Sequence, residues 1–491
     1  MPGIKRMDDA GLYAAFKAKD TRFDGRFYVG VSSTGIYCRP VCRARMPKAA
    51  NCAFFPTAAE AERAGYRPCL LCRPELAPGG SVMDATAVLA GKAARMLDAQ
   101  CDAQESLETL AERLGCTGRH LRRVFAAAYH VSPVAYLQTR RLLLAKNLLT
   151  DTRLSVLDVA MAAGFGSVRR LNHLFQKHYR LTPTALRKRA PDDGGRGGDI
   201  ALLLGYRPPY RYDAMLNFLA GRAIAGIEKV EGGCYLRAVR LKREDAASID
   251  GWIRVGHAPE KNALRLTLSH SLLPVLPQVL ARVRHLFDVD ADPEAMDETL
   301  ASMNGIRDGL YVKGTRLPGC FDAFEMAVRA VLGQQITVKA AGTLAGRLVS
   351  ALGLPVSTGI AGLTHVFPSP EDMPALDAPI EARLGPLGVV SARARTIGAL
   401  AEALAHGAVD FSLCAHPEAE MAKLLAIPGI GRWTAQYIAM RAMAWPDAFL
   451  ETDAGIKKAL APLTPKEMLA LAEAWHPWRS YATINLWNAL S

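Results

Sequence analysis

Two closely spaced cysteine pairs near the N-terminus constrain this chain more than any other feature. The pairs follow the patterns C-x3-C and C-x2-C, with residues 43–68 between them. Two such pairs on either side of a loop are typical of a closed, tetrahedral zinc site. We therefore predict a small α/β domain over residues 1–78 that holds one Zn²⁺ through Cys38, Cys42, Cys69 and Cys72. The nearby Cys52 lies outside both pairs and is expected to be an ordinary thiol.

Composition agrees with a metal site rather than a disulfide framework. The chain has no signal-peptide stretch at its start and no run of eighteen apolar residues, so we expect a cytoplasmic protein with no membrane partner. Its net charge of +13 favours an anionic polymer or surface as partner. A length of 491 residues predicts several domains.

Arginines crowd the same loops as the cysteines. Such cations suit a phosphodiester backbone, and a zinc-bound thiolate keeps a nucleophilic character that protonation would remove. A thiolate held near phosphate can accept an alkyl group, whereas a purely structural zinc site is the alternative for the same residues. The arginines concerned are Arg39, Arg43, Arg45, Arg67 and Arg73.

A middle block, residues 83–189, contains an internal repeat. The sequence "LAERLGCTGRHLRRVFAAAYHVSP" aligns with "VAMAAGFGSVRRLNHLFQKHYRLTP", and each copy reads as a helix, a glycine turn, a basic second helix and a proline stop. This pattern is a helix-turn-helix written twice. Its second helices suit phosphates and base edges, through Arg169, Arg170 and Asn172 in the second copy, although two helical hairpins with solvated basic faces would give a similar pattern.

The glycine-rich segment 190–199, "APDDGGRGGD", predicts a linker to a third block. Strand-like segments over 200–291 predict an α+β subdomain, and the remainder, 292–491, is expected to be helical. Within it, "PGIG" separates two helical patterns, as in a helix-hairpin-helix, where Gly429 and Gly431 can offer backbone N–H groups to DNA phosphate. Asp453 follows this motif, and "ETDAGIKKAL" favours a helix with Asp453 as its N-cap, a role that can coexist with another one.

The N-terminal region resembles the zinc domain of the Ada family, through "FYVGVSSTGIYCRPVCRARMPKAANCAFFPTAAEAERAGYRPCLLCRP". The middle block is similar to the AraC-type DNA-binding domain. The resemblance implies that Cys38 irreversibly takes a methyl group from a methylphosphotriester in DNA. The loss of one negative charge would then raise affinity for promoter DNA. The Pro-Cys-His-Arg site of a second Ada methyltransferase domain does not occur in the chain.

The third block resembles the AlkA family of helix-hairpin-helix DNA glycosylases, through "GYRPPYRYDAMLNFLAGRAI", "LPGCFDAFEMAVRAVLGQQITV" and "IPGIGRWTAQYIAMR". The resemblance implies that Asp453 is the catalytic aspartate and that Gln335 stands at the position of a wedge into the DNA stack. Trp433 occupies the place of the Schiff-base lysine of strand-cutting relatives, so a monofunctional enzyme is expected. An alkylated, cationic base would stack in a pocket of aromatic side chains, namely Trp433, Tyr437, Trp487 and Phe218.

Together these features predict a multidomain, mainly α protein that combines a methyl-accepting transcription activator with a 3-methyladenine-type glycosylase. Double-stranded DNA, both damaged and promoter, is the expected partner, RNA polymerase is a candidate partner, and we expect a monomer. No organic cofactor and no iron–sulfur cluster are expected. The alternatives are a regulator whose C-terminal block binds DNA without excising bases, and a zinc-stabilised architectural DNA binder in which Cys38 is only structural.

Overall fold

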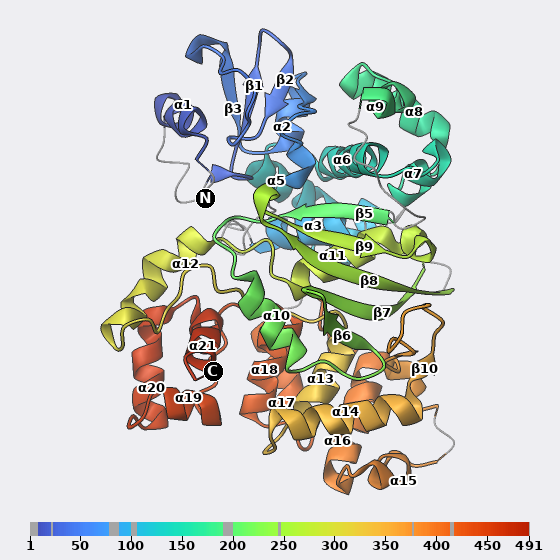
Figure 1. Ribbon diagram of the computed structural model, residues 1–491, viewed down its shortest axis with the longest axis vertical. Coiled ribbons are helices and arrows are strands. Elements are labelled where there is room, and N and C mark those ends of the chain that lie inside the picture. The colour runs from blue at the N-terminus through green and yellow to red at the C-terminus, as the bar shows by residue number, and fades with distance from the viewer. Residues whose placement is uncertain are drawn as a thin grey trace.

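The computed structural model describes residues 8–20, 23–77, 88–99, 106–189, 200–243, 247–375, 378–412 and 417–490. The predicted linker, 190–199, lies outside these residues. Figure 1 shows a small blue domain and a cyan-green helical block at one end, a central green sheet, and a yellow-to-red helical lobe at the other end. Among the described residues, no helix combines the length and apolar character needed to cross a membrane. The predicted multidomain, mainly helical fold is confirmed.

The N-terminal domain is built on a four-stranded sheet with the order β3-β1-β2-β4. Strand β2 pairs antiparallel with β1, which sets Cys38 opposite Val29 in the sheet. Thr57 caps the helix after β3, since its side chain accepts the Glu60 N–H. The elements are α1 (Asp9–Ala18), β1 (Tyr28–Val31), β2 (Ile36–Cys38), β3 (Cys52–Phe55), α2 (Ala58–Arg63) and β4 (Arg67–Pro68).

Seven helices follow within residues 88–99 and 106–189, and the predicted duplication is visible in their caps. Thr117 and Ser167 cap the two equivalent second helices, and Gly115 and Gly164 turn with φ of 67° and 75°. These glycines adopt the left-handed conformation that a tight helix-to-helix turn requires. The helices are α3 (Val88–Ala99), α4 (Leu107–Arg113), α5 (Gly118–Tyr129), α6 (Pro133–Asp151), α7 (Val156–Ala162), α8 (Val168–Tyr179) and α9 (Pro183–Arg189).

The central sheet has five antiparallel strands in the order β5-β9-β8-β7-β6. Alternating apolar side chains of β8 and β9 pack against α11 and form the largest core. The elements are β5 (Ile200–Gly205), α10 (Tyr212–Ala220), β6 (Glu228–Glu231), β7 (Cys234–Lys242), β8 (Ser248–Ala258), β9 (Ala263–Leu268) and α11 (Leu276–Leu286).

This core continues into the second helix-turn-helix. Leu142 of α6, Val159 of α7 and Phe175 of α8 belong to one buried apolar cluster with Leu266 of β9 and Val279 of α11. The helices of the middle block therefore lie directly on the sheet, as Figure 1 shows for α6 and β5. The two blocks share a core rather than meeting only through the segment that joins them in sequence.

The C-terminal helical lobe has two parts. Helix α12 returns to pack with α19–α21 around Trp475 and Trp478, whereas α13, α16 and α18 pack together around Ile438 and Leu400. The elements are α12 (Pro293–Leu300), α13 (Ala323–Leu332), α14 (Val338–Leu352), β10 (Leu354–Pro355), β11 (His365–Val366), α15 (Ile380–Leu384), α16 (Ser391–Ala405), α17 (Pro417–Leu425), α18 (Arg432–Ala442), α19 (Ala454–Ala459), α20 (Pro465–Ala472) and α21 (Arg479–Asn488).

Buried ion pairs fasten the sheet to this lobe. Arg237 of β7 lies between Glu228 of β6 and Glu325 of α13, and Arg329 contacts the same two carboxylates. Each charge is compensated by two of opposite sign, which a buried charge requires. The alternating cluster fixes α13, and with it the loop that follows, against the sheet.

Candidate functional site

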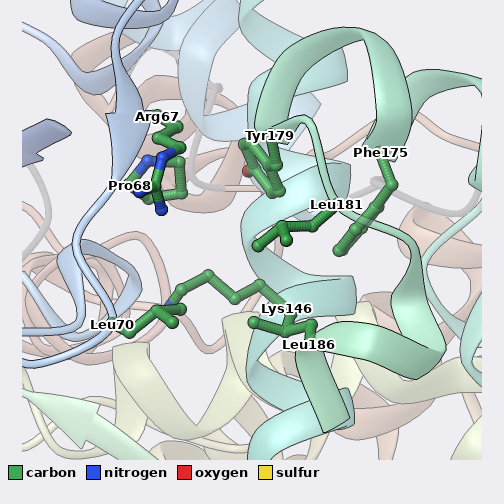
Figure 2. A pocket seen from close by; sticks show the side chains of 8 residues that line it. All are labelled: Arg67, Pro68, Leu70, Lys146, Phe175, Tyr179, Leu181 and Leu186. Carbon is green, nitrogen blue, oxygen red and sulfur yellow. The ribbon is translucent and has the colours of Figure 1, made fainter. Parts of the chain in front are cut away.

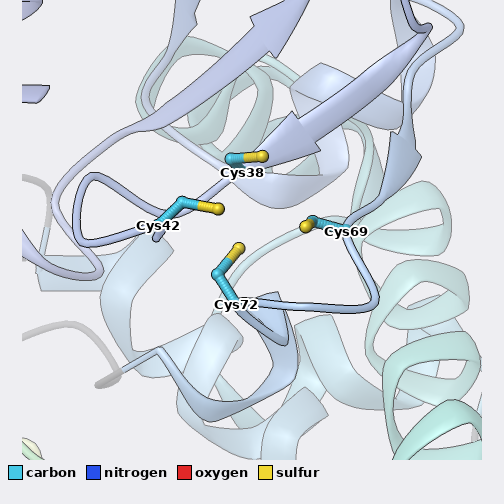
Figure 3. A group of neighbouring side chains, drawn as sticks. All are labelled: Cys38, Cys42, Cys69 and Cys72. Carbon is cyan, nitrogen blue, oxygen red and sulfur yellow. The ribbon is translucent and has the colours of Figure 1, made fainter. Parts of the chain in front are cut away.

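The four predicted cysteines converge at one point of the N-terminal domain (Figure 3). Their Sγ atoms all lie within 4.8 Å of one another, and all but Cys72 are buried. Zn–S bonds of about 2.3 Å place the sulfurs of a tetrahedral site about 3.8 Å apart, so the set fits one zinc ion. Four thiolates are a preferred donor set for Zn²⁺, and the four cysteines are the ligands of one Zn²⁺.

Local backbone bonds explain how the cluster forms. Cys38 ends β2, and a turn in which the Cys42 N–H donates to the Arg39 carbonyl brings the second sulfur back. Cys69 follows β4, where its N–H donates to the Tyr37 carbonyl at 3.0 Å. Cys52 lies apart from the cluster, since its thiol contacts the Lys48 carbonyl.

The arginines of these loops divide into two groups. Arg39, which we predicted to contact DNA, is only 6 % exposed, and its guanidinium forms a buried ion pair with Asp24. It also donates to the Cys72 carbonyl at 3.1 Å, while its backbone N–H lies 3.3 Å from the Cys72 sulfur. Arg73 is likewise held by Glu75 and Asp151. Arg39 therefore supports the cysteine loops from within, whereas Arg73, with 22 % of its side chain exposed, is held by these carboxylates near the surface.

Arg43 and Arg45 are exposed next to Cys42, where they are free to meet an anionic backbone. Arg67 is half-buried and lines a small cavity of about 10 Å³ between β4 and the second helix-turn-helix. Figure 2 shows Arg67 and Pro68 on one side of this cavity and Tyr179 on the other. The space is about that of one water molecule, so the two domains are closely packed here.

On α8, the side chains predicted to contact DNA face outward. Arg169, Arg170 and Asn172 are all exposed, whereas Leu171 and Phe175 on the opposite face are fully buried. The exposed face therefore offers planar donors of the kind that contact base edges and phosphates.

Asp453 is the N-cap of α19, which was one of the two roles predicted for it from the sequence, the other being catalysis. Its Oδ1 accepts the N–H groups of Gly455 and Ile456 at 2.8 and 3.1 Å. The indole N–H groups of two tryptophans also donate to this carboxylate. Trp433 donates to Oδ2 at 3.0 Å and Trp487 donates to Oδ1 at 2.9 Å. Four donors thus hold the carboxylate in one orientation at a helix N-terminus.

Gly455 makes this arrangement possible, and the sequence analysis did not identify it. A Cβ at this position would come within 2.9 Å of Trp487 Cδ1 and 3.0 Å of Asp453 Oδ1. Only glycine leaves room for the Trp487 ring beside the carboxylate. The signal in the sequence was the glycine two positions after Asp453, in "DAG", at the start of the expected helix.

The predicted aromatic residues also gather beside Asp453. The ring of Trp433 stacks on that of Tyr437 with centroids 5.2 Å apart, and Tyr437 lies 6.3 Å from Trp487. Phe218 reaches the same region from α10, with Arg222 over its ring at 3.7 Å and Arg441 at 4.9 Å. The structure therefore brings all four predicted pocket residues to one place.

Arg441 is a buried member of this group that the sequence analysis missed. It donates to the Tyr437 hydroxyl at 2.8 Å and to the Gly319 carbonyl at 3.0 Å. Burial raises the pKa of Tyr437, but Arg441, Arg222 and Arg329 outweigh burial and leave the pKa below its ordinary value.

The predicted hairpin lies between α17 and α18. Gly429 has a φ of 91°, and a Cβ there would come within 2.0 Å of Thr396 Oγ1, so no larger residue fits. Gly431 is the N-cap of α18 and has open space around it. Gln334 donates to the Gly429 carbonyl at 2.9 Å and to Thr434 Oγ1 at 3.0 Å, which ties the loop after α13 to the hairpin.

Gln335 projects from that tied loop. Its side chain is exposed and its φ of 56° lies in the left-handed region, which a non-glycine residue seldom adopts. Such a conformation at the tip of an anchored loop is typical of a functional position.

Taken together, the fold and sites define a protein with a thiolate zinc domain, a double helix-turn-helix and a helix-hairpin-helix lobe with a partly buried aspartate. Family models match accordingly: the metal-binding domain of Ada at residues 11–75, a helix-turn-helix domain at 110–189, and the AlkA N-terminal domain at 201–322.

Relatives match along the whole chain. The "Probable bifunctional transcriptional activator/DNA repair enzyme AlkA" of Mycobacterium tuberculosis is 39 % identical over 97 % of this chain and 96 % of its own length. The "DNA-3-methyladenine glycosylase 2" of Escherichia coli is 34 % identical over 58 % of this chain and 95 % of its own. The "Bifunctional transcriptional activator/DNA repair enzyme AdaA" of Bacillus subtilis is 30 % identical over 34 % of this chain and 78 % of its own. The chain belongs to the family of Ada–AlkA fusion proteins.

Proposed function

We propose that this protein both senses and repairs alkylated DNA, as a stoichiometric methyl acceptor and transcription activator fused to a 3-methyladenine-type DNA glycosylase. The observation that carries the enzymatic part is the anchored carboxylate of Asp453, surrounded by aromatic rings and placed beside a helix-hairpin-helix. The names of the full-length and glycosylase relatives support it.

For base excision, the reacting base must leave the duplex and enter the aromatic group. Alkylation at N3 or N7 makes a purine cationic, and the faces of Trp433 and Tyr437 attract such a cation while the base becomes a better leaving group. As the glycosidic bond breaks, positive charge develops on the sugar. The oriented Asp453 carboxylate stabilises that charge and directs the attacking water, with no covalent step to the protein.

The hairpin and the loop tip position the DNA in this scheme. The N–H groups around Gly429 and Gly431 contact a phosphate without reading sequence, and Gln335 enters the space that the departed base leaves. The amide contacts of Gln334 hold hairpin and tip at a fixed separation, so both engage one duplex together.

In the sensor part, Cys38 is the methyl acceptor. Its thiolate sulfur attacks the methyl carbon of a methylphosphotriester, an S–C bond forms, and the C–O bond breaks with its electron pair on the phosphate oxygen. The zinc keeps the sulfurs deprotonated when it is bound. The exposed Arg43 and Arg45 approach the DNA backbone. Methylation of Cys38 removes one negative charge from the cysteine cluster, which weakens the repulsion between the cluster and the DNA phosphates.

Double-stranded DNA is the partner of both parts, and α8 reads promoter sequence through Arg169, Arg170 and Asn172. An activator acts on transcription through RNA polymerase, which we propose as the protein partner of a monomer. Since its substrate is genomic DNA, we expect the protein to act in the cytoplasm.

Two assays on the full chain test these activities. With methylated duplex DNA, the wild-type protein should release 3-methyladenine and leave alkali-labile sites, and Asp453→Asn should release at least about a hundredfold less base. Spontaneous strand breaks together with a borohydride-trapped adduct would contradict hydrolysis by water. In mass spectrometry after incubation with methylphosphotriester DNA, the wild type should gain one methyl group and Cys38→Ala none.

The alternative of a regulator that binds DNA without excision predicts equal DNA affinity for wild type and Asp453→Asn with no base released by either. The alternative of an architectural zinc domain predicts no methyl gain at all.

A further inference from the structure

A buried carboxylate joins the zinc domain to the second helix-turn-helix. Glu62, on α2, is 7 % exposed, and hydroxyl groups from three other elements donate to it. Tyr37 of β2 and Tyr179 of α8 donate to Oε1 at 3.1 and 3.3 Å, and Thr139 of α6 donates to Oε2 at 3.0 Å. One side chain therefore connects the strand of the methyl acceptor with the connecting helix and the recognition helix.

Each donor is firmly placed in its own element. Tyr37 is fully buried, precedes Cys38 in β2, and its carbonyl accepts the Cys69 N–H. Tyr179, the last residue of α8, is 3 % exposed and packs edge-on against Phe175 with ring centroids 5.0 Å apart. A displacement of α8 relative to the zinc cluster would thus break the bond to Glu62 before it disturbed either core.

The energetic cost of this carboxylate indicates a role in orientation. Burial raises the pKa of Glu62 to about 7, and the three hydroxyl groups only partly offset the loss of solvation. An apolar residue of similar size would stabilise a simple interface better, whereas a carboxylate with three directed donors permits one geometry.

A neighbouring ion pair also stabilises this interface, but it fixes the position of α6 and not that of α8. Lys146 of α6 and Glu75, which are 1 and 2 % exposed at their side chains, form a buried pair at 2.6 Å. This pair fastens α6 to the segment after Cys72. The bond between Glu62 and Tyr179 is a directed polar contact to the end of α8, beside the packing of β4 against the same helix.

We propose that Glu62 is a positioning residue that fixes the second recognition helix relative to Cys38, so that methyl capture and promoter reading take place on one rigid surface. This inference rests on the proposed sensor function. It predicts that the hydrogen bonds of Glu62 are needed for sequence-specific DNA binding through α8 but not for methyl transfer.

The test compares three full-chain variants with the wild type: Glu62→Ala, Glu62→Gln and Tyr179→Phe. The probe is a duplex that the wild-type chain selects from a random-sequence pool, analysed by affinity and hydroxyl-radical footprint. Methyl gain from methylphosphotriester DNA is measured on the same preparations. Glu60→Ala, on the same helix, is the control, because the ion pair of Glu60 with Arg63 is long, at 3.9 Å.

We expect Glu62→Ala and Tyr179→Phe to bind about tenfold more weakly, the effect of losing about one base-edge contact, and to lose the footprint of one half-site. Their methyl transfer rates should equal that of the wild type. Glu62→Gln retains an acceptor oxygen for the tyrosines and should restore both affinity and footprint, and Glu60→Ala should behave as the wild type.

An unchanged footprint in Glu62→Ala and Tyr179→Phe would overturn the proposal. So would a parallel loss of methyl transfer and DNA binding, since that result indicates general unfolding of the domain. Failure of the wild type to accept a methyl group would instead refute the proposed sensor function, independently of how the variants bind.

Discussion

The substitution Gly455→Ala tests whether the orientation of Asp453 limits base excision. The new Cβ would come within 2.9 Å of Trp487 Cδ1 and 3.2 Å of its Nε1, so the indole must move away from the carboxylate. Both contacting atoms belong to a ring held by α21, and the ring cannot simply rotate its end out of the way. The hydrogen bond of 2.9 Å between Trp487 and Asp453 Oδ1 is then lost.

The size of the effect follows from the kind of bond. A hydrogen bond to a charged group contributes about 1.5–3 kcal/mol, which corresponds to a rate change of about ten- to a hundredfold if it acts in the transition state. A displacement of about 1 Å at a reacting group has a comparable cost. The helix itself should gain stability, because alanine is favoured over glycine by about 1 kcal/mol in a helix interior and by less near the N-terminus.

The assay is single-turnover release of 3-methyladenine, with thermal unfolding measured in parallel. We expect Gly455→Ala to remain folded but to melt at a somewhat lower temperature, because the lost hydrogen bond outweighs the gain from alanine, while its excision rate falls at least about tenfold. Gly346→Ala on α14 is the matched control, because a Cβ there has nothing within 4 Å. Trp487→Phe keeps an aromatic face but lacks the N–H, and should show a similar loss.

Full excision activity in Gly455→Ala would refute the reasoning, because the carboxylate would then not need the Trp487 donor. A large loss in Trp487→Ala with none in Trp487→Phe would show that stacking, rather than the hydrogen bond, is the contribution of this residue.

Further predictions concern the other parts of the chain. Zinc removal by a chelator should abolish methyl gain at Cys38 while base release continues, because the ligands lie in the N-terminal domain and Asp453 lies in the helical lobe; mass spectrometry and the excision assay check this. Since burial raises the pKa of Glu62 from 4.5 to about 7, its stabilising contribution is complete below pH 4.5 and is lost as the pH rises to 7. Denaturant unfolding should therefore show a loss of about 1.4 kcal/mol between pH 6 and pH 8 in the wild type that is missing in Glu62→Gln. A fragment ending at residue 189 should melt at lower temperature than the full chain and bind a hydrophobic dye, because it exposes Leu142 and Val159, which are buried in the core shared with the sheet; dye binding equal to that of the full chain would contradict a shared core.

Features that depend on local spacing were predictable from the sequence. The zinc site follows from two short cysteine spacings and is confirmed, and the double helix-turn-helix follows from a repeat that places Phe125 and Phe175 at equivalent buried positions. The cap role of Asp453 likewise depends on the residues that directly follow it. In each case the residues that define the structure lie close together in the chain or recur at a fixed period.

Features that depend on distant partners were not predictable. Arg39 was assigned to DNA because nothing in the nearby sequence marks Asp24 as its partner, and the bond is visible only once the domain is folded. The apolar face of α7 could equally have packed within its own domain, because periodicity shows that a face is buried but not against what. The pairing of Glu62 with Tyr179 spans 117 positions and carries no sequence signature.

The core shared by the second helix-turn-helix and the central sheet also has a cellular meaning. A methyl acceptor is consumed by one reaction, whereas a glycosylase turns over repeatedly. If the two parts were encoded by separate genes, a cell could set the amount of each protein independently. Here the side chains of both parts fill one interior, so each spent sensor remains attached to a working enzyme. If alkylation damage raises transcription, every new molecule adds one unused acceptor and one enzyme in the same ratio.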